Sequence, residues 1–327
     1  MAYAIAEQAL QAAVIQPPYD MRFLADVIKG LSSTPKSISP KYFYDENGSR
    51  FFDEICQLKE YYLYKTELAL LPRVASDLAG MLTGSFSVVE FGAGSLQKIR
   101  PFLRNIPAIK SFYPIDISGA YLRDTTRKLQ AEFPDVAMQA VEGDFTLPVH
   151  LPEPSATREQ RLGFFPGSTI GNFTPEQAKR FLLNARKTLG DDAYLIIGVD
   201  TKKSPDILHR AYNDDKGVTK RFNLNVLSRI NREFDCDLKL SDFEHYAFYN
   251  PVEGRIEMHL VSQTHQTVNI VGTDITFRSG ETIHTESSYK YTPQEFMQLA
   301  QSAGWRIERT WLAGEAMFST YLLRVDH

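Results

Sequence analysis

The chain has 327 residues, of which 43% are hydrophobic and 23% are charged, and its formal net charge is −4. This composition is typical of a soluble globular protein, and the negative balance argues against nucleic-acid binding through basic patches. No apolar stretch approaches the roughly 20 residues that span a bilayer. The N-terminal segment carries Glu7 and lacks a basic flank, which makes it a poor signal peptide. Cys56 and Cys236 lie in no disulfide motif, so we expect a cytoplasmic protein.

The first 66 residues predict helix and then an aromatic-rich segment. Residues 2–31 place apolar side chains at helical spacing, interrupted by Pro17-Pro18. Most aromatic side chains simply pack in a core, although tyrosines on two loops could supply hydroxyl groups to a pocket. The aromatic residues of this segment are Tyr42, Phe43, Tyr44, Phe51, Phe52, Tyr61, Tyr62 and Tyr64.

From Thr66 onward, the pattern predicts strands that alternate with helices. A helix from Thr66 to about Leu82 precedes a strand that begins at Ser85, and a Thr174-Pro175-Glu176-Gln177 capping box starts a later helix that ends at Gly190. The other elements expected here are a helix to about residue 104, a strand ending at 116, a helix at 118–133, and strands at 136–144, 163–166 and 193–200. This alternation predicts a parallel α/β sheet.

The alternation stops after Asp200. Ser204-Pro205 starts a short helix that carries Tyr212, residues 217–234 predict a longer helix, and residues 246–289 alternate as in antiparallel strands. A capping box at 292–295 then starts a helix to Gly304, followed by two terminal strands that close the sheet as an antiparallel pair. We predict an α/β, Rossmann-like sheet domain of residues 67–201 plus 291–327, and an α+β domain of residues 1–66 plus 202–290.

The predicted strand at 85–91 opens into a turn suited to a nucleotide-type ligand. Glu90 precedes Gly92-Ala93-Gly94, and two glycines allow the backbone of the turn to approach a ligand closely. A dinucleotide fingerprint requires a third glycine, at the position of Gln97. An acid before G-x-G without that glycine is typical of the first motif of S-adenosylmethionine-dependent methyltransferases, although short glycine-rich turns also occur as plain structural loops.

The ends of the next strands carry further candidate ligand-binding residues. Asp116 can accept the ribose hydroxyls of a nucleoside, Asp144 can face an adenine amino group, and Phe145 can lie along the ring. Either acid alone could instead cap a helix or be solvated in a turn. Lys98 could reach a ligand carboxylate or be a solvated lysine. Asn172, after the fourth strand, has an amide that can hold an amine or a carboxylate.

Blocks over nearly the whole chain carry a more specific pattern: PKSISPKYFYDENGSRFFDEI, FGAGSLQK, PIDIS, GDF, GSTIGN, RAYNDDKGVTKRFNLNVL, DFEHYAFYN, RIEM and TESSYK. These blocks resemble the histidine-specific Nα-methyltransferases of ergothioneine biosynthesis, which trimethylate the α-amino group of L-histidine to hercynine. The resemblance implies a class I methyltransferase sheet, S-adenosyl-L-methionine as the cofactor, S-adenosyl-L-homocysteine as its product, and a small-molecule substrate.

The resemblance also implies roles for individual residues. Tyr44 would lie between the cofactor and the substrate amine, and Tyr44 and Asn172 would be the catalytic residues. The cofactor-binding set is Tyr44, Gly92, Lys98, Asp116, Asp144 and Phe145, and the substrate-binding set is Tyr61, Asn172, Tyr212, Met258, Glu286, Ser287 and Ser288. A neutral imidazole presents one donor and one acceptor, which a carboxylate and hydroxyl groups can satisfy. Met258 offers an adaptable apolar wall.

Two departures and three alternatives accompany this interpretation. Gln97 stands where an acid is expected in many relatives, and residues 312–320 also differ from the expected pattern. Another aromatic amino acid such as tryptophan is the alternative substrate, which Glu286 and Met258 disfavour because an indole offers only a donor. A catalytically silent regulator and a nicotinamide oxidoreductase fit the strand-end motifs less well. The seven histidines have no metal-ligand spacing, so we predict no metal, and we expect a monomer without a nucleic-acid or membrane partner.

Overall fold

The computed structural model describes residues 19–152 and 159–326, and its contacts divide the chain into two compact units. The small unit comprises Met1–Ile55, Asn213–Ala247 and Met258–Glu286, and the large unit comprises Cys56–Tyr212, Phe248–Glu257 and Ser287–His327. Residues 2–18 of the predicted N-terminal helix lie outside the described residues. The predicted domain boundaries differ from those of the units and stay a prediction.

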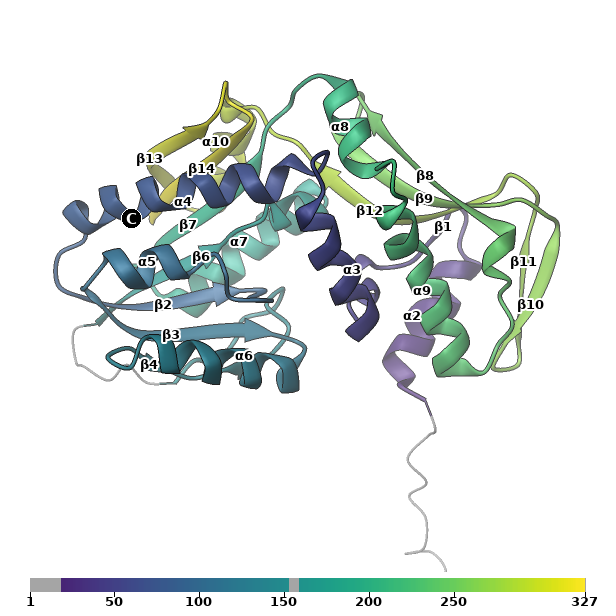
Figure 1. The fold of residues 1–327 in the computed structure, drawn as a ribbon, viewed down its shortest axis with the longest axis horizontal. Coiled ribbons are helices and arrows are strands. Elements are labelled where there is room, and N and C mark those ends of the chain that lie inside the picture. The colour runs from purple at the N-terminus through teal and green to yellow at the C-terminus, as the bar shows by residue number, and fades with distance from the viewer. Residues whose placement is uncertain (1–18, 153–158, 327) are drawn as a thin grey trace, which may run out of the picture. The chain divides into compact units, whose positions relative to one another are not determined.

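The large unit is built on one mostly parallel sheet (Figure 1). Its strands follow the order β13-β14-β7-β6-β2-β3-β4, and β5 also pairs with β3. The pairs among β6, β7, β2, β3, β4 and β5 are parallel, whereas β14 is antiparallel to β13 and β7. The terminal antiparallel pair predicted from the sequence is therefore confirmed. The strand bounds are β2 Ser85–Phe91, β3 Ile109–Asp116, β4 Ala137–Met138, β5 Val141–Glu142, β6 Glu159–Phe165, β7 Tyr194–Asp200, β13 Trp305–Ala313 and β14 Phe318–Val325.

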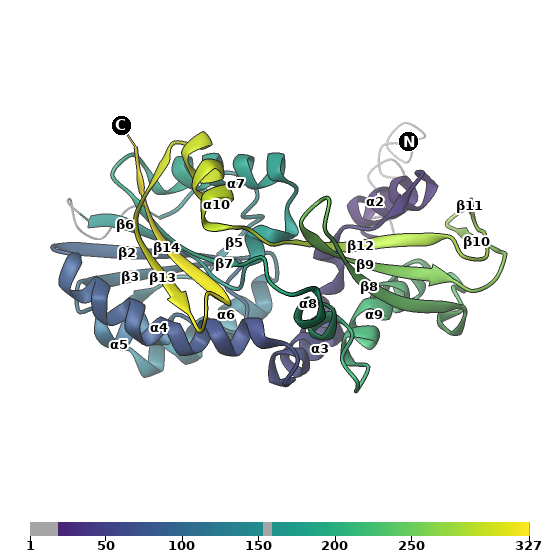
Figure 2. The ribbon, with the colours of Figure 1, turned by 90° about the horizontal axis from the view of Figure 1, so that it is seen from above.

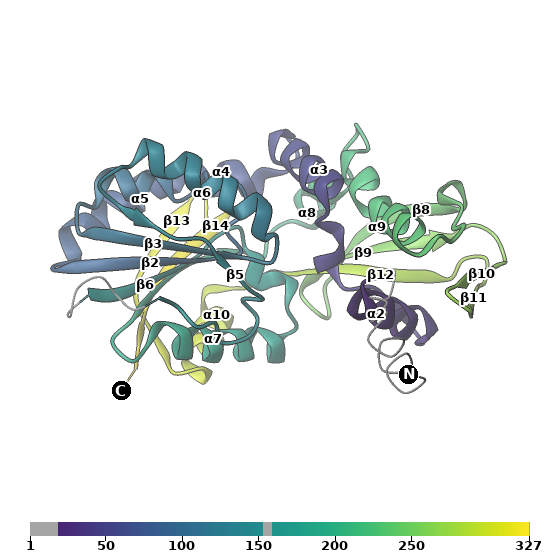
Figure 3. The same cartoon turned by 90° about the horizontal axis from the view of Figure 1, so that it is seen from below.

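Helices cover both faces of this sheet, as Figures 2 and 3 show. On one face lie α4 (Tyr62–Met81), α5 (Arg100–Asn105) and α6 (Gly119–Glu132), and on the other lie α7 (Pro175–Leu189) and α10 (Pro293–Ser302). Each face has its own apolar cluster, which includes Phe102 and Leu122 on the first face and Phe181 and Phe296 on the second. Strands buried on both faces explain the nearly continuous apolar runs of β2 and β7.

Several predicted boundaries are wrong, for local reasons. Helix α4 begins at Tyr62 rather than at Thr66, because its first turn already buries Leu63. The helix after the glycine turn begins only at Arg100. The strand predicted at 136–144 is split into β4 and β5, and the Gln130 side chain accepts the backbone N–H of Met138, the last residue of β4.

Other predictions from local sequence signals are confirmed. Both predicted capping boxes form, at Thr174 before α7 and at Thr292 before α10. Helix α7 ends at Gly190 as predicted, and the short helix α8 (Pro205–Tyr212) carries Tyr212. Helix α6 begins after Ser118, but the Ser118 side chain makes no capping bond; its backbone N–H donates to Asp116 instead.

The small unit combines helices with a second sheet, of order β1-β12-β9-β8. A separate antiparallel hairpin, β10–β11, projects from it (Figure 1). The last residues of β8 and β12 and the first of β9 belong to the large unit. The bounds are α2 Met21–Ser32, β1 Lys36–Ser37, η1 Pro40–Phe43, α3 Glu46–Gln57, α9 Val218–Phe234, η3 Leu240–Asp242, β8 Phe243–Asn250, β9 Arg255–Ser262, β10 Gln266–Ile270, β11 Thr273–Phe277 and β12 Thr282–Tyr289.

Aromatic packing joins α2, η1 and α9 in the small unit. The Phe23 ring lies 4.2 Å from that of Tyr42 and 4.9 Å from that of Phe234, and the Arg229 guanidinium stacks 4.7 Å above Phe23. The Tyr42 hydroxyl donates to Asp26 at 2.5 Å. Burial, reinforced by this carboxylate, raises the pKa of Tyr42. These N-terminal aromatic side chains therefore pack, as the sequence predicted for most of them.

Among the described residues, every helix is too short or too polar to cross a membrane.

A buried acid lies at the end of the central strand β2. Glu90 is 2% exposed, and its Oε2 atom has no hydrogen-bond partner among the described residues. Burial raises the pKa of Glu90 well above its usual value; the positive charge of Lys98 opposes this shift, and the negative charges of Glu67 and Asp116 add to it. The folded protein therefore holds the Glu90 proton more tightly than the unfolded chain does.

This proton linkage predicts the effect of Glu90→Gln on stability. Because the pKa of Glu90 is higher in the folded state, its contribution to the free energy of unfolding falls as pH rises above the unfolded pKa. Glutamine cannot ionise, so we expect the variant to gain stability over wild type as pH rises from 5 to 8. The gain should exceed the roughly 0.5 kcal/mol typical of surface substitutions. Urea unfolding across this pH range measures it.

Glu176→Gln, at an exposed position in the first turn of α7, is the matched control. Its difference from wild type should stay constant over the same pH range. A Glu90→Gln difference that is equally constant would contradict the linkage.

Candidate functional site

The turn after β2 places main-chain groups at the carboxyl edge of the parallel sheet. Gly92 and Gly94 have φ values of 69° and 50°, and the N–H of Gly92 donates to the carbonyl of Ile115 in β3. A Cβ atom on Gly92 would lie 3.1 Å from the Phe145 ring. Positive φ and this close approach together favour glycine at position 92. The turn therefore packs directly against the Phe145 ring.

The predicted ribose and adenine residues lie at neighbouring strand ends. Asp116 ends β3, and its carboxylate accepts the backbone N–H of Ser118 at 2.9 Å and that of Gly94 at 3.4 Å. The carboxylate of Asp144, just after β5, accepts the Thr146 hydroxyl at 2.5 Å. Both carboxylates are only partly buried, so they can still accept hydrogen bonds from a bound nucleoside.

Phe145 is held by the aromatic cluster of the second sheet face. Its ring centroid lies 5.7 Å from that of Phe165 in β6 and 6.1 Å from that of Phe181 in α7, both edge-on. This packing fixes the plane of the Phe145 ring beside Gly92. The strand ends thus supply a close backbone turn, two carboxylates and an oriented aromatic face, which suit a nucleoside.

Lys98 lies in an ion pair that the sequence did not predict. Its ammonium is 2.7 Å from Oε2 of Glu67, a side chain that is 1% exposed, and 5.3 Å above the ring of Tyr64. Glu67 also accepts the backbone N–H of Gly167 at 2.9 Å. A Cβ atom on Gly198 would lie 2.1 Å from Oε1 of Glu67, so glycine at 198 makes room for this carboxylate.

Asn172 ends a short 3-10 helix, η2 (Thr169–Asn172), that directly follows β6. The turn into this helix is tight: Ser168 has a φ of 57°, and its Oγ accepts the backbone N–H of Asp200 at 2.9 Å. A Cβ atom on Gly171 would lie 2.7 Å from the carbonyl oxygen of Tyr289. These contacts fix the loop that positions Asn172 at the carboxyl edge of the sheet.

Three predicted substrate residues come together in the large unit. The Tyr212 hydroxyl donates to Oγ of Ser288 at 2.8 Å, and the Tyr61 ring meets that of Tyr212 edge-on at 6.2 Å. Tyr61 precedes α4, Tyr212 ends α8 and Ser288 lies in β12, so three distant segments contribute. Ser287 is the partly buried neighbour of Ser288. The structure therefore groups residues that the sequence only placed in separate blocks.

The remaining predicted residues, Tyr44, Met258 and Glu286, belong to the small unit. Tyr44 follows η1, and its ring lies 5.7 Å from the rings of Phe52 and Phe222. Met258 is 1% exposed, and its carbonyl oxygen accepts the hydroxyl of Thr285, the residue before Glu286. Within this unit, β9 and β12 thus bring Met258 close to the backbone beside Glu286.

Two histidines on neighbouring strands meet in the small unit. The rings of His259 in β9 and His284 in β12 stack with their centroids 4.8 Å apart. The ring of a third, His245, bonds with the Asn223 side chain at 2.9 Å. Histidines far apart in the sequence can therefore lie together, and the absence of a metal stays a prediction.

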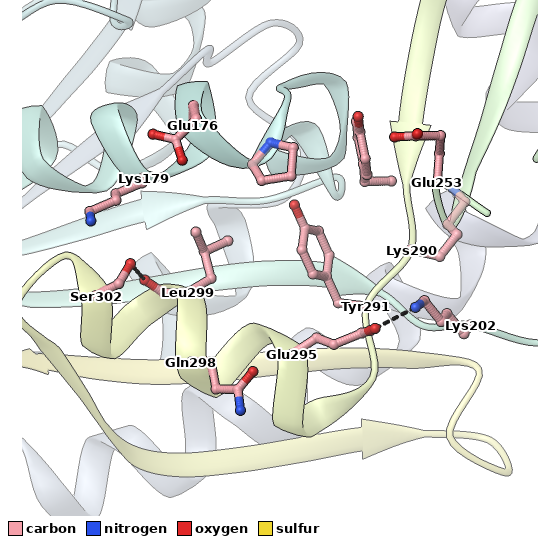
Figure 4. A pocket seen from close by; sticks show the side chains of 12 residues that line it. Glu176, Lys179, Lys202, Glu253, Lys290, Tyr291, Glu295, Gln298, Leu299 and Ser302 are labelled. Carbon is pink, nitrogen blue, oxygen red and sulfur yellow. Dashed lines mark hydrogen bonds and ion pairs between the residues drawn. The ribbon is translucent and has the colours of Figure 1, made fainter. Parts of the chain in front are cut away.

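A cavity of about 470 Å³ on the large unit lies between α7, α10 and the segment after β12 (Figure 4). None of the predicted site residues lines it. The charged residues that line it are three lysines and three glutamates, in equal number: Lys179, Lys202, Lys290, Glu176, Glu253 and Glu295. Lys202 and Glu295 already form an ion pair at 2.5 Å. Balanced charges give this cavity no clear preference for a charged ligand.

The sequence analysis missed a buried polar cluster next to the predicted substrate residues. Asp200, at the end of β7, accepts the Tyr62 hydroxyl at 2.6 Å and pairs with Lys203 at 2.6 Å and Lys290 at 2.9 Å. Asp200 and the Lys290 side chain are both 0% exposed. An acid at a strand end was the available signal, since the same signal identified Asp116.

Comparisons with known proteins identify the family of the chain. A family profile described as "Histidine-specific methyltransferase, SAM-dependent" matches residues 23–325. A protein of Mycolicibacterium smegmatis named histidine N-alpha-methyltransferase is 39% identical over 88% of this chain and 89% of its own.

Two fungal relatives are more distant. Ergothioneine biosynthesis protein 1 of Schizosaccharomyces pombe is 27% identical over 86% of this chain, which corresponds to 38% of that longer protein. A 4-dimethylallyltryptophan N-methyltransferase of Aspergillus fumigatus is 28% identical over 91% of this chain and 92% of its own. With the profile match over nearly the whole length, these relationships show that the chain belongs to the family of histidine-specific, S-adenosylmethionine-dependent methyltransferases.

Proposed function

We propose that this protein transfers three methyl groups from S-adenosyl-L-methionine to the α-amino nitrogen of L-histidine, giving hercynine and S-adenosyl-L-homocysteine. This reaction is the first step of ergothioneine biosynthesis. The observation that carries the proposal is the family match over residues 23–325, because every predicted site residue lies within it. The match to the mycobacterial relative, which extends over most of both chains, supports histidine as the substrate.

The strand-end residues of the large unit would hold the cofactor. The Gly92 turn would pass close to the nucleoside, Asp116 would accept from the ribose hydroxyls, and Asp144 would accept from the adenine amino group beside the Phe145 ring. Lys98 would bind the carboxylate of the methionine end while keeping its Glu67 partner, because an ammonium has three N–H donors. When bound, S-adenosylmethionine supplies an electrophilic methyl group on a sulfonium.

The remaining predicted residues would orient histidine. Asn172 and Tyr212 would bind its carboxylate and amino end, and Tyr44 would lie beside the amine. Since a neutral amine must point its lone pair at the reacting methyl carbon, positioning is the main contribution that these side chains can make. The amine loses its protons to solvent over the three transfers, and the product keeps one fixed positive charge.

The imidazole side chain would be recognised by Tyr61, Met258, Glu286, Ser287 and Ser288. We propose that the protein acts as a cytoplasmic monomer without a metal, a nucleic-acid partner or a membrane partner. Another aromatic amino acid such as tryptophan is the alternative substrate. The fungal relative that is named for a tryptophan derivative supports this alternative.

We expect purified protein incubated with S-adenosylmethionine and single amino acids to convert histidine into a product that carries three added methyl groups. Mass spectrometry of each reaction measures the number of methyl groups transferred. A histidine product that stops at one or two groups would contradict trimethylation. Turnover of tryptophan in preference to histidine would favour the alternative substrate.

Glu286→Ala is expected to weaken histidine binding specifically. A hydrogen bond to a charged group is worth about 1.5–3 kcal/mol, so the Michaelis constant for histidine should rise about tenfold or more. The Michaelis constant for S-adenosylmethionine should change by less than about twofold, because the proposed cofactor residues are elsewhere. Steady-state kinetics with each substrate varied in turn measures both constants.

Glu244→Ala is the matched control for Glu286→Ala. Glu244 is an exposed acid in β8 that pairs with Lys220, and its removal should leave both Michaelis constants unchanged. Equal increases in the two constants for Glu286→Ala would contradict a role in the imidazole pocket.

A further inference from the structure

The buried ammonium of Lys290 has a contact for each of its three protons. It lies 2.9 Å from Oδ2 of Asp200, 2.7 Å from Oγ of Ser288 and 3.2 Å from the Tyr212 hydroxyl oxygen. An ammonium group has three N–H donors and accepts nothing. All three partners must therefore act as acceptors toward Lys290.

This arrangement determines the direction of the Ser288 proton. A serine oxygen has two lone pairs, and Oγ of Ser288 accepts from both Lys290 and the Tyr212 hydroxyl. With both lone pairs used, Ser288 can only donate its own proton, and a ligand atom that meets it must be an acceptor. The acceptor nitrogen of a neutral imidazole meets this requirement, whereas an indole ring has no such atom.

We propose that Lys290, anchored by Asp200, is a positioning residue that makes Ser288 an obligate hydrogen-bond donor toward the substrate's imidazole. The inference rests on the proposed function, because that function makes histidine the substrate and Ser288 part of its pocket. Lys290 touches no proposed substrate atom itself; it acts through the hydroxyl pair of Tyr212 and Ser288.

Asp200, which anchors Lys290, is itself held by contacts with several segments. The backbone N–H of Asp200 donates to Ser168, its carbonyl accepts the N–H of Tyr291, and Thr201 pairs with Tyr291 as a parallel bridge. Because Lys290 directly precedes Tyr291, this backbone pairing places the Lys290 ammonium beside the Asp200 carboxylate. Burial disfavours the charged lysine, but the Asp200 carboxylate outweighs it and raises the pKa of Lys290. Lys290 therefore remains protonated at neutral pH.

A second lysine makes removal of Lys290 tolerable. Lys203 donates its three protons to Oδ1 of Asp200, the Tyr62 hydroxyl and the carbonyl oxygen of Thr201, none of which belongs to the hydroxyl pair. Burial lowers the pKa of Lys203 to about 8, which leaves it mostly charged at neutral pH. Two lysines on one carboxylate carry a net positive charge, so a variant without Lys290 keeps a neutral Asp200–Lys203 pair and is expected to fold.

The test compares Lys290→Met with wild type. Loss of the ammonium frees a lone pair on Ser288, so its proton can turn away from the substrate. We expect the Michaelis constant for histidine to rise about tenfold, as for loss of one oriented hydrogen bond, and that for S-adenosylmethionine to stay within about twofold. In a Ser288→Ala background the same substitution should raise the histidine constant less than about threefold, because the hydroxyl it orients is gone.

Lys203→Met is the matched control, since it removes the other lysine from the same carboxylate. It should raise the histidine constant by less than about threefold. Lys290→Gln guards against misfolding of the methionine variant: its amide can donate to Asp200, but its carbonyl also accepts, so it should raise the histidine constant as Lys290→Met does. Thermal unfolding checks the fold of each variant.

Separate outcomes distinguish the two proposals. Wild-type protein that fails to methylate histidine overturns the proposed function and this inference with it. Wild-type protein that methylates histidine while Lys290→Met raises both Michaelis constants equally, or raises the histidine constant just as much without Ser288, overturns the inference alone. Selective loss of histidine binding that disappears in the Ser288→Ala background supports it.

Discussion

The candidate site of the large unit depends on the contacts that one carboxylate, that of Asp200, makes with its neighbours. A buried charge is costly unless it is paired and hydrogen-bonded, and Asp200 is surrounded by donors from several segments. Tyr62 comes from the start of α4, Lys203 from the loop after β7, and Lys290 from the segment after β12. Each donor satisfies the same charge, so the four chain segments cannot shift independently.

Glycines, which have no side chain, are as important to this site as its polar residues. Gly198 leaves the space that Glu67 occupies, Gly171 lets η2 pass the backbone of Tyr289, and Gly92 admits the Phe145 ring. These glycines come from three different segments; Gly92 belongs to the G-x-G turn and Gly171 to the GSTIGN block, whereas Gly198 lies in no block singled out from the sequence. The edge of the sheet is thus shaped by close approaches between segments, while the polar groups fill the space that remains.

Much of the large unit could be predicted from the sequence because its signals are local. The order of strands and helices follows from apolar periodicity, and both capping boxes have a fixed residue pattern. Asp116 and Asp144 were predictable because carboxyl ends of neighbouring parallel strands meet at one edge. The start of α4 was not, because packing of Leu63 decides it, and neither was the split of the predicted strand into β4 and β5.

The buried ion pairs escaped prediction for a different reason. Glu67 lies in an apolar helical run, where a single acidic residue is usually interpreted as solvated. Its partner Lys98 comes 31 positions later in the sequence, after β2. Lys290 ends the TESSYK block, but nothing in that block indicates that its partner is Asp200. Such pairs depend on three-dimensional proximity between residues that share no motif. The sequence therefore indicated candidate ligand-binding residues at the strand ends, but it did not indicate the buried ion pairs beside them.

The ion pair between Lys98 and Glu67 has a consequence for repeated turnover. If Lys98 binds the cofactor's carboxylate as proposed, each arrival adds a second carboxylate to an ammonium that Glu67 already neutralises, and each departure restores the single pair. Lys98 then has a counter-ion at every stage, and the buried Glu67 carboxylate keeps its cation. An enzyme that transfers three methyl groups would renew its donor twice for each product, and a lysine already paired with Glu67 would hold the carboxylate of the spent donor less tightly than an unpaired lysine would.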